Sequence, residues 1–123
     1  MSELTNDQDG AKQARLSAIS RRILERLPIP GDHRELVVAE VTYPAAGAAP
    51  IHRHPVAGIV YIIEGTAESA YGSDEPRQYR RGETLQDRAD LPHTQFRNCD
   101  SQEPLRFLTI YVVEPGRSYV TDP

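Results

Sequence analysis

The segment that most constrains the fold is a pair of histidines followed by an apolar run. His52 and His54 are separated by one residue, and the β-branched and aromatic run 59–63 follows and is closed by Gly65. Such a run, bounded by Pro and Gly, is typical of a strand. Because side chains alternate along a strand, two histidines at i and i+2 point to the same face. If that face looks into a barrel, both imidazoles and the later His93 can reach one metal ion.

After its first 30 residues the sequence predicts β structure almost throughout. Short runs of alternating or β-branched residues recur between Gly and Pro turns, which is typical of a small barrel or sandwich. The predicted fold class is therefore all-β, a barrel of roughly six to eight strands. The expected strands are 36–43, 51–63, 67–71, 78–80, 84–86, 94–97 and 105–113.

The N-terminal part differs from the rest in composition. Residues 1–10 are polar and acidic and are expected to form a flexible tail. Residues 11–30 are expected to form an arm, for which two interpretations stay open. Apolar residues at helical spacing favour a short amphipathic helix, whereas 20–27 could equally form an edge strand. Residues 31–123 are expected to form the barrel domain.

Composition and charge exclude several classes of protein. With 123 residues the chain suits one domain with one core. Its net charge of -4 argues against nucleic-acid binding, which needs clustered Lys and Arg. The single cysteine, Cys99, allows no disulfide within the chain and fits a reducing compartment. No secretory signal is visible and no apolar run approaches the ~20 residues that span a bilayer, so we expect a cytoplasmic protein with no membrane partner.

The histidine segments and their surroundings resemble the cupin superfamily of small double-stranded β-helix barrels. The resemblance covers about residues 36–113, with both family motifs in order and a short spacer between them. It implies a metal site whose ligands are His52, His54 and His93. The matching positions along the two motifs are Gly47, His52, His54, Gly65, Gly82, His93 and Asn98, whereas the family's Pro-x-Gly turn reads Arg88-Ala89-Asp90 here, which keeps a turn-forming Asp but changes the local shape.

The chain departs from the family pattern at the fourth ligand. The family's glutamate falls at Gly58, which has no side chain to bind a metal. Three-histidine cupins that resemble this pattern include thiol dioxygenases and a β-diketone dioxygenase, both with ferrous iron. The resemblance therefore favours Fe(II), although imidazole also suits Zn, Ni, Mn or Cu. Without the carboxylate the ion carries more net positive charge, which favours an anionic substrate.

Two further side chains are candidates for the chemistry. Asp87 lies six residues before His93, where the diketone-cleaving type has a carboxylate near the metal. It could orient a ligand or bind the ion weakly, or it could be a solvated turn aspartate, and both interpretations stay open. Gln95 lies two residues after His93 and should share its face, where it could donate a hydrogen bond to a bound oxygen. His33 is expected in an exposed loop.

Three functions of different classes are compatible with this pattern. The first is a ferrous dioxygenase acting on a small anionic or enolisable, diketone-like compound. The second is a metal-dependent isomerase, cyclase or lyase in which the ion is only a Lewis acid. The third is a non-catalytic ligand-binding cupin. Small barrels with exposed edges often dimerise, so we expect a homodimer, to which residues 11–27 could contribute by lying on the partner.

Overall fold

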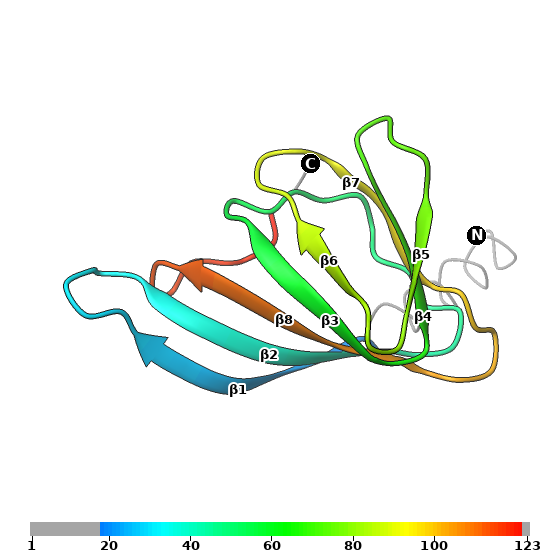
Figure 1. Cartoon of the computed structure of the whole chain (residues 1–123), viewed down its shortest axis with the longest axis horizontal. Helices are drawn as coiled ribbons and strands as arrows, with labels where there is room; N and C mark the ends of the chain where they lie inside the picture. Colours follow the sequence, from blue (N-terminus) through cyan, green and yellow to red (C-terminus); the bar gives the residue numbers. More distant parts are fainter. Residues whose placement is uncertain (1–17, 122–123) are drawn as a thin grey trace, which may run out of the picture.

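The computed structural model describes residues 18–121, and this part of the chain is built from strands (Figure 1). It contains no helix, and so none long and apolar enough to cross a membrane. The all-β prediction is confirmed. In chain order the strands are β1 (Ser20–Pro28), β2 (Glu35–Tyr43), β3 (Gly58–Glu64), β4 (Thr66–Tyr71), β5 (Arg77–Arg80), β6 (Thr84–Asp87), β7 (His93–Asn98) and β8 (Leu105–Val113).

The strands form two antiparallel sheets. The larger has the order β1-β2-β8-β3-β6, and the smaller has the order β5-β4-β7. In Figure 1 the smaller sheet rises from one end of the larger one. The chain passes between them at Gly65, whose φ of 89° lies in the left-handed region that glycine adopts without strain. An added Cβ there would lie 2.8 Å from the Pro104 carbonyl oxygen, so the close approach of two backbones also requires glycine.

The core lies between the sheets because alternate residues of the long strands face inward. In β8 every second residue is buried, from Leu105 to Val113. Ile62 of β3 and Ala67 of β4 are completely buried in the same cluster, although they belong to different sheets. Phe96 of β7 lies edge-on to Phe107 of β8, with ring centroids 5.0 Å apart. Residues of both sheets therefore pack in this main cluster, and a second, smaller cluster contains Val37, Tyr111, Val113 and Tyr119.

The structure decides between the two interpretations of the N-terminal arm. Residues 20–28 are a strand, β1, at the edge of the larger sheet, so the helix is wrong for this part. β1 pairs with β2 from Ser20 opposite Thr42 to Pro28 opposite Glu35, with one irregularity. Residues 1–17, which include the expected tail and the start of the arm, lie outside the described residues.

The expected strand 51–63 is divided in two. Only its second half is the regular strand β3, and the histidine pair lies before it in a segment of isolated bridges. Pro55 follows the pair directly and cannot donate a ladder hydrogen bond, which accounts for the break. Alternation nevertheless persists through the bridges, because His52 and His54 are buried while Arg53 between them is partly exposed.

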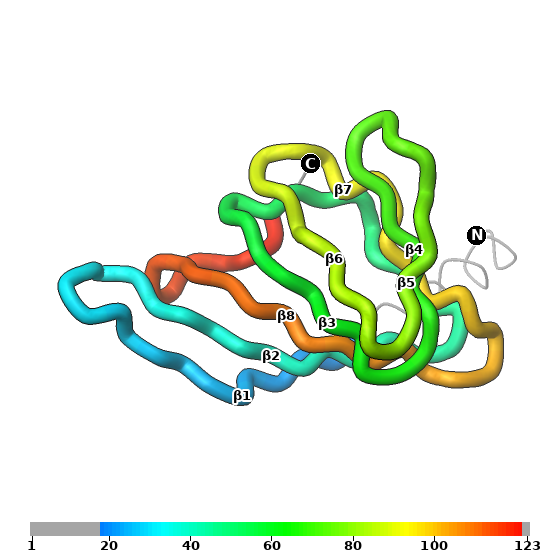
Figure 2. Tube along the Cα trace, viewed as in Figure 1, coloured from blue at the N-terminus to red at the C-terminus, as the bar shows by residue number. Residues whose placement is uncertain are grey.

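The segment after β8 returns to the histidine pair. Thr121 and Arg53 exchange two backbone hydrogen bonds of 3.0 and 2.8 Å. Figure 2 shows this last part of the chain turning back from β8 toward the stretch that precedes β3. Tyr119 is buried as a result, with its ring stacked on that of Tyr111 at a centroid distance of 3.8 Å. The C-terminal segment thus forms part of the wall around the histidines.

Candidate metal centre

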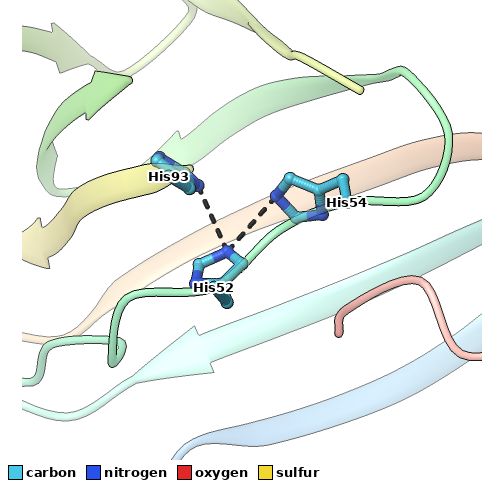
Figure 3. Close-up of side chains that lie close together, drawn as sticks. All are labelled: His52, His54 and His93. Atoms are coloured by element: carbon cyan, nitrogen blue, oxygen red, sulfur yellow. Dashed lines mark hydrogen bonds between the residues drawn. The ribbon is translucent and has the colours of Figure 1, made fainter. Parts of the chain in front are cut away.

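Three histidines from two distant segments converge inside the barrel (Figure 3). His52 and His54 come from the segment before β3, and His93 is the first residue of β7. The backbone brings them together, because His93 N donates to His52 O at 2.7 Å. His52 Nε2 lies 3.3 Å from His54 Nε2 and 3.2 Å from His93 Nδ1, and all three ligand atoms lie within 4.8 Å of one another. The predicted triad is therefore present and buried.

The outward nitrogen of each ring has a partner of its own. His52 Nδ1 donates to the Pro50 carbonyl oxygen at 2.7 Å, and His54 Nδ1 donates to the Tyr119 carbonyl oxygen at 3.1 Å. Since a carbonyl oxygen only accepts, Nδ1 of each of these rings carries a proton, and in the neutral tautomer the lone pair is then on Nε2. His93 Nε2 contacts Ser69 Oγ at 2.8 Å, so its Nδ1 faces the other two rings. Such outer partners orient imidazoles for metal binding.

The spacing of His52 Nε2 from each of the other two inward-facing nitrogens fits a shared divalent metal ion. Ligand atoms about 2.1 Å from one ion lie ~3.0–3.4 Å apart at octahedral or tetrahedral angles, which matches the two short distances above. Burial lowers the pKa of His93 to about 3, and the neighbouring His52 and His54 add to this effect. Burial also lowers the pKa of His54. All three residues are positioned to bind a metal ion, and the two whose pKa is lowered are held in the neutral form that a metal requires.

Asp87 lies beside the triad and is buried rather than solvated. It is the last residue of β6, and its Oδ1 is 3.5 Å from His54 Nε2. Tyr71 Oη donates to Oδ1 at 2.6 Å and Tyr119 Oη donates to Oδ2 at 3.1 Å. Burial and the Asp87 carboxylate both raise the pKa of the two tyrosines above its ordinary value, so they remain protonated donors. The solvated-turn interpretation of Asp87 is wrong, since its carboxylate is buried beside the three histidines.

The surroundings of Gly58 explain why this position, where the family pattern has glutamate, carries no side chain. It pairs with Asp87 across β3 and β6. A Cβ at this position would lie 2.0 Å from Tyr119 Oη and 3.0 Å from the Ile110 carbonyl oxygen. The space that a side chain would need is therefore filled by the Tyr119 hydroxyl, which binds Asp87 instead. The Tyr119 hydroxyl and the Asp87 carboxylate therefore lie together beside Gly58.

Gln95 does not share the face of His93, contrary to the prediction. The register of β4 and β7 shifts between Ala70 and Tyr71, which lie opposite Gln95 and His93. This irregularity breaks strict alternation. The Gln95 amide donates to Glu68 Oε1 at 2.6 Å, and Phe96 is the residue whose ring lies near His93, with centroids 5.4 Å apart. Gln95 is therefore not among the residues that line the site.

Sequence reasoning missed three side chains of the site: Ser69, Tyr71 and Tyr119. Tyr71 also stacks on the His93 ring at a centroid distance of 4.0 Å. Tyr119 lies beyond the last expected strand, where no periodicity assigns it a face. The one available signal was Gly58, since a glycine in an otherwise β-branched run marks a close approach.

The triad lies in a cavity of 340 Å³ whose lining is mostly aliphatic and aromatic. This volume is at the small end of ordinary ligand sites. Its lining residues include Arg21, Val41, Tyr43, Val60, Phe107 and Thr109.

A buried three-histidine cluster within a small antiparallel barrel defines a metal-binding β-barrel. The chain belongs to the cupin family, since the family's Cupin domain model matches residues 39–111. The resemblance inferred from the motifs is confirmed. A search of curated proteins returned no match.

Solved structures agree with this fold. The cupin 2 domain-containing protein of Halorhodospira halophila has a TM-score of 0.66 at 21% identity, over 87% of this chain and 71% of that one. The DMSP lyase DddQ of Ruegeria pomeroyi has a TM-score of 0.65 at 22% identity, over 81% of this chain and 49% of that one. The oxalate decarboxylase of Lactobacillus farciminis has a TM-score of 0.59 at 20% identity, over 71% of this chain and 26% of that one. This chain thus spans about half of the lyase and about a quarter of the decarboxylase.

Proposed function

We propose that this cupin is a metal-dependent enzyme acting on a small anionic or enolisable compound, with His52, His54 and His93 holding the ion. The observation that carries the proposal is the convergence of three ring nitrogens, with neighbouring distances of 3.2 and 3.3 Å, beside a buried cavity. A divalent cation between these nitrogens would accept a lone pair from each neutral ring, whereas hydrogen bonds within the cluster can pair only some of them. A structural ion would not need an adjoining cavity, so the position also favours chemistry.

A bound divalent ion would act as a Lewis acid on the substrate, and Fe(II), the ion we expect first, would add reactions with dioxygen. The chain's own residues bind and orient. The apolar lining excludes water from the substrate, and the outer partners of the histidines fix each ring. Asp87 is held in one orientation by Tyr71 and Tyr119, so its carboxylate is available to accept a proton beside the triad. A ferrous dioxygenase is the first candidate reaction.

A metal-dependent lyase, isomerase or cyclase is the second candidate, and the position of Asp87 favours it. Such reactions need a base placed next to the polarising ion, and Asp87 Oδ1 lies 3.5 Å from His54 Nε2. Two of the similar structures are named as a lyase and a decarboxylase, which is in keeping with this candidate.

Two measurements test the proposal in order. Untagged protein, purified without added metal, is analysed for Fe, Zn, Ni, Mn and Cu, and the metal-free protein is then titrated with Fe(II) and Zn(II) by calorimetry. About one equivalent of a transition metal, absent from His54→Ala, supports the site. The loaded protein is next incubated with a panel of 1,3-diketones and 2-oxo acids under air and under argon. Turnover that requires air identifies the dioxygenase, and turnover in both identifies the second candidate. Absence of metal under all conditions would overturn both.

A further inference from the structure

Arg21 differs from the other arginines of β1 in what it faces. Arg22 pairs with Glu40 at 3.7 Å, and Arg26 pairs with Glu35. Arg21 lines the histidine cavity, and within residues 18–121 no carboxylate lies within ion-pair distance of it. Its guanidinium lies over the Tyr111 ring, 5.4 Å from the centroid, and its side chain is exposed at the cavity rim. An arginine placed in this way presents its donors to whatever occupies the cavity.

Thr109 supplies a second, independent observation deeper in the same cavity. It is 6% exposed, and its hydroxyl is the buried side-chain polar atom without a hydrogen-bond partner in the described part of the chain. Its neighbours across β8 are Ala39 and Val60, which offer no side-chain partner. Buried polar groups in proteins are almost always paired, so an unpaired hydroxyl that lines a cavity indicates a ligand group.

Charge in the cavity points to an anion. Among residues 18–121, Arg21 and Asp87 are the only Arg, Lys, Asp or Glu side chains that line the cavity. Both Asp87 oxygens already accept tyrosine hydroxyls, so this carboxylate does not need Arg21 as a partner. Between Arg21 at the rim and Thr109 inside, the walls are formed by apolar residues such as Val41, Tyr43 and Phe107.

We propose that the cavity binds a small carboxylate with an apolar body and a second oxygen group. The carboxylate pairs with Arg21, the body packs on the apolar walls, and the second oxygen lies toward Thr109 and the histidines. This rests on the proposed function in that it names the substrate class of the same site. Arg21 and Thr109 are then the residues that determine specificity: Arg21 selects the charge and Thr109 selects an oxygen over a methyl group.

The test compares an acid with its neutral amide. The probes are 4-methyl-2-oxopentanoate and 4-methyl-2-oxopentanamide, and their binding is measured by calorimetry to metal-free and to Zn(II)-loaded protein. In the wild type the acid should bind at least about tenfold more tightly than the amide, because charge-assisted hydrogen bonds are the strong ones. Arg21→Gln should remove this preference. Arg22→Gln, the neighbouring arginine on the same strand, should retain it.

Thr109→Val tests the second contact with a readout that a purely structural role would not give. Replacing an unpaired buried hydroxyl by a methyl group should leave the melting temperature unchanged or raise it. The same change should weaken both probes by roughly three- to tenfold. A lower melting temperature with unaltered binding would overturn the assignment of Thr109.

The outcomes separate this inference from the proposed function. If Zn(II) binds but Arg21→Gln retains the preference of the wild type, the carboxylate assignment is overturned and the metal site stands. If Zn(II) binds and neither probe binds, the carboxylate assignment is likewise overturned and the metal site stands. If no metal binds while the acid still binds in an Arg21-dependent way, the metal enzyme is overturned and the carboxylate site stands.

Discussion

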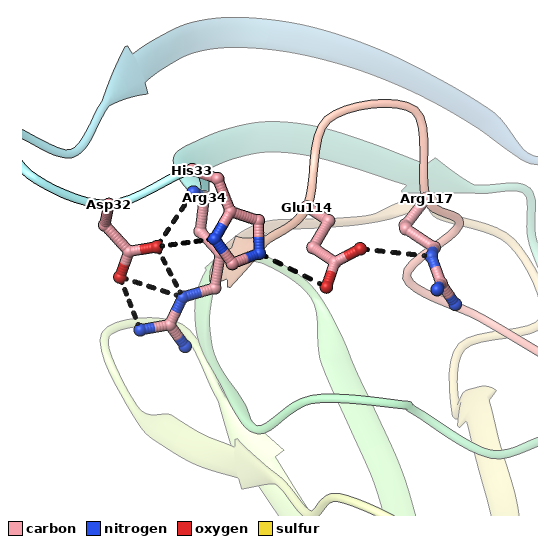
Figure 4. A network of polar contacts seen from close by, with 5 residues as sticks. All are labelled: Asp32, His33, Arg34, Glu114 and Arg117. Carbon is pink, nitrogen blue, oxygen red and sulfur yellow. Dashed lines mark hydrogen bonds and ion pairs between the residues drawn. The ribbon is translucent and has the colours of Figure 1, made fainter.

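Two clusters of this molecule combine histidine with aspartate at nearly the same distance. In the buried cluster His54 Nε2 and Asp87 Oδ1 lie 3.5 Å apart, and both side chains are 5% exposed. In the other cluster His33 Nδ1 and Asp32 Oδ1 lie 3.4 Å apart, with side chains that are 73% and 24% exposed. Figure 4 shows that the exposed cluster includes Arg34, which binds Asp32, and continues from His33 through Glu114 to Arg117. We call the first, with His52 and His93, the buried cluster and the second the exposed network.

The comparison shows that partners, rather than distance, decide what such a cluster can do. In the exposed network Arg34 hydrogen-bonds Asp32 and lowers its carboxyl pKa to about 2. Opposite charges there are already balanced and water screens them. In the buried cluster the Asp87 carboxylate accepts from two tyrosine hydroxyls instead of from an arginine, and three imidazole nitrogens lie within 4.8 Å of one another. Of the two clusters, the buried one is therefore the one whose side chains are positioned to share a metal ion.

Removing one histidine from each cluster should give the largest contrast. His54→Ala should reduce Zn(II) affinity by at least about 100-fold, because losing an orienting partner alone typically costs 10- to 100-fold and here a ligand is lost. His33→Ala should leave the affinity unchanged. Calorimetric titration of the metal-free proteins measures both, and far-UV circular dichroism verifies that each variant is folded. Equal affinities for the two variants would contradict the assignment of the site.

Gly58→Ala should be the most destabilising of the small substitutions. The added methyl group would lie 2.0 Å from Tyr119 Oη, so the C-terminal segment must move. Overpacking of this kind costs about 1–3 kcal/mol, measured by urea unfolding. Tyr119→Phe removes the clashing hydroxyl, so the double variant Gly58→Ala/Tyr119→Phe should recover part of the loss. Strict additivity of the two changes would show that they do not interact.

Asp87→Asn should destabilise the protein by about 1–2 kcal/mol, because two tyrosine hydroxyls lose charged acceptors in a buried site. It should also weaken Zn(II) binding by roughly tenfold, as expected for a carboxylate that supports or joins the ligands. Urea unfolding and calorimetry give the two values separately. If neither the free energy of unfolding nor the Zn(II) affinity changed, Asp87 would support neither the fold nor the metal site.

The sequence was sufficient to predict which three histidines converge and insufficient to predict which side chains surround them, for a physical reason. The bounds of β8 and the shared face of His52 and His54 follow from local alternation, which the sequence contains. The place of Gln95 depends on a register shift between β4 and β7, and alternation fails there. Tyr119 and Thr109 line the cavity only because segments that are distant in the sequence pack around it. Register and long-range packing are set by the whole fold, so no local pattern predicts them.

The metal-free protein should lose stability as the pH falls below about 6.5. The folded protein keeps His93 neutral down to a pKa of about 3, whereas an unfolded chain binds a proton near 6.5. The unfolded state therefore binds more protons between these values, and stability decreases by about 1–2 kcal/mol toward pH 5. Thermal unfolding in the presence of EDTA measures this decrease. The same decrease in stability is expected in His33→Ala. If the decrease disappeared in that variant, protonation of the exposed His33 rather than of His93 would be its cause.

Arg34→Gln should have the smallest effect, although it removes the most extensively hydrogen-bonded ion pair of the exposed network. Because the pKa of Asp32 is lowered in the folded protein, any stabilisation by this ion pair is present above pH ~4 and is lost as the pH falls toward 2. This pH range lies below the one in which protonation of His93 begins to affect stability. Because the pair is solvated, the melting temperature at pH 7 should not change measurably. NMR titration should instead show the Asp32 carboxyl pKa rising to its ordinary value. A clear loss of stability or of Zn(II) affinity in this variant would mean that the exposed network supports the buried site, and the contrast between the two clusters would fail.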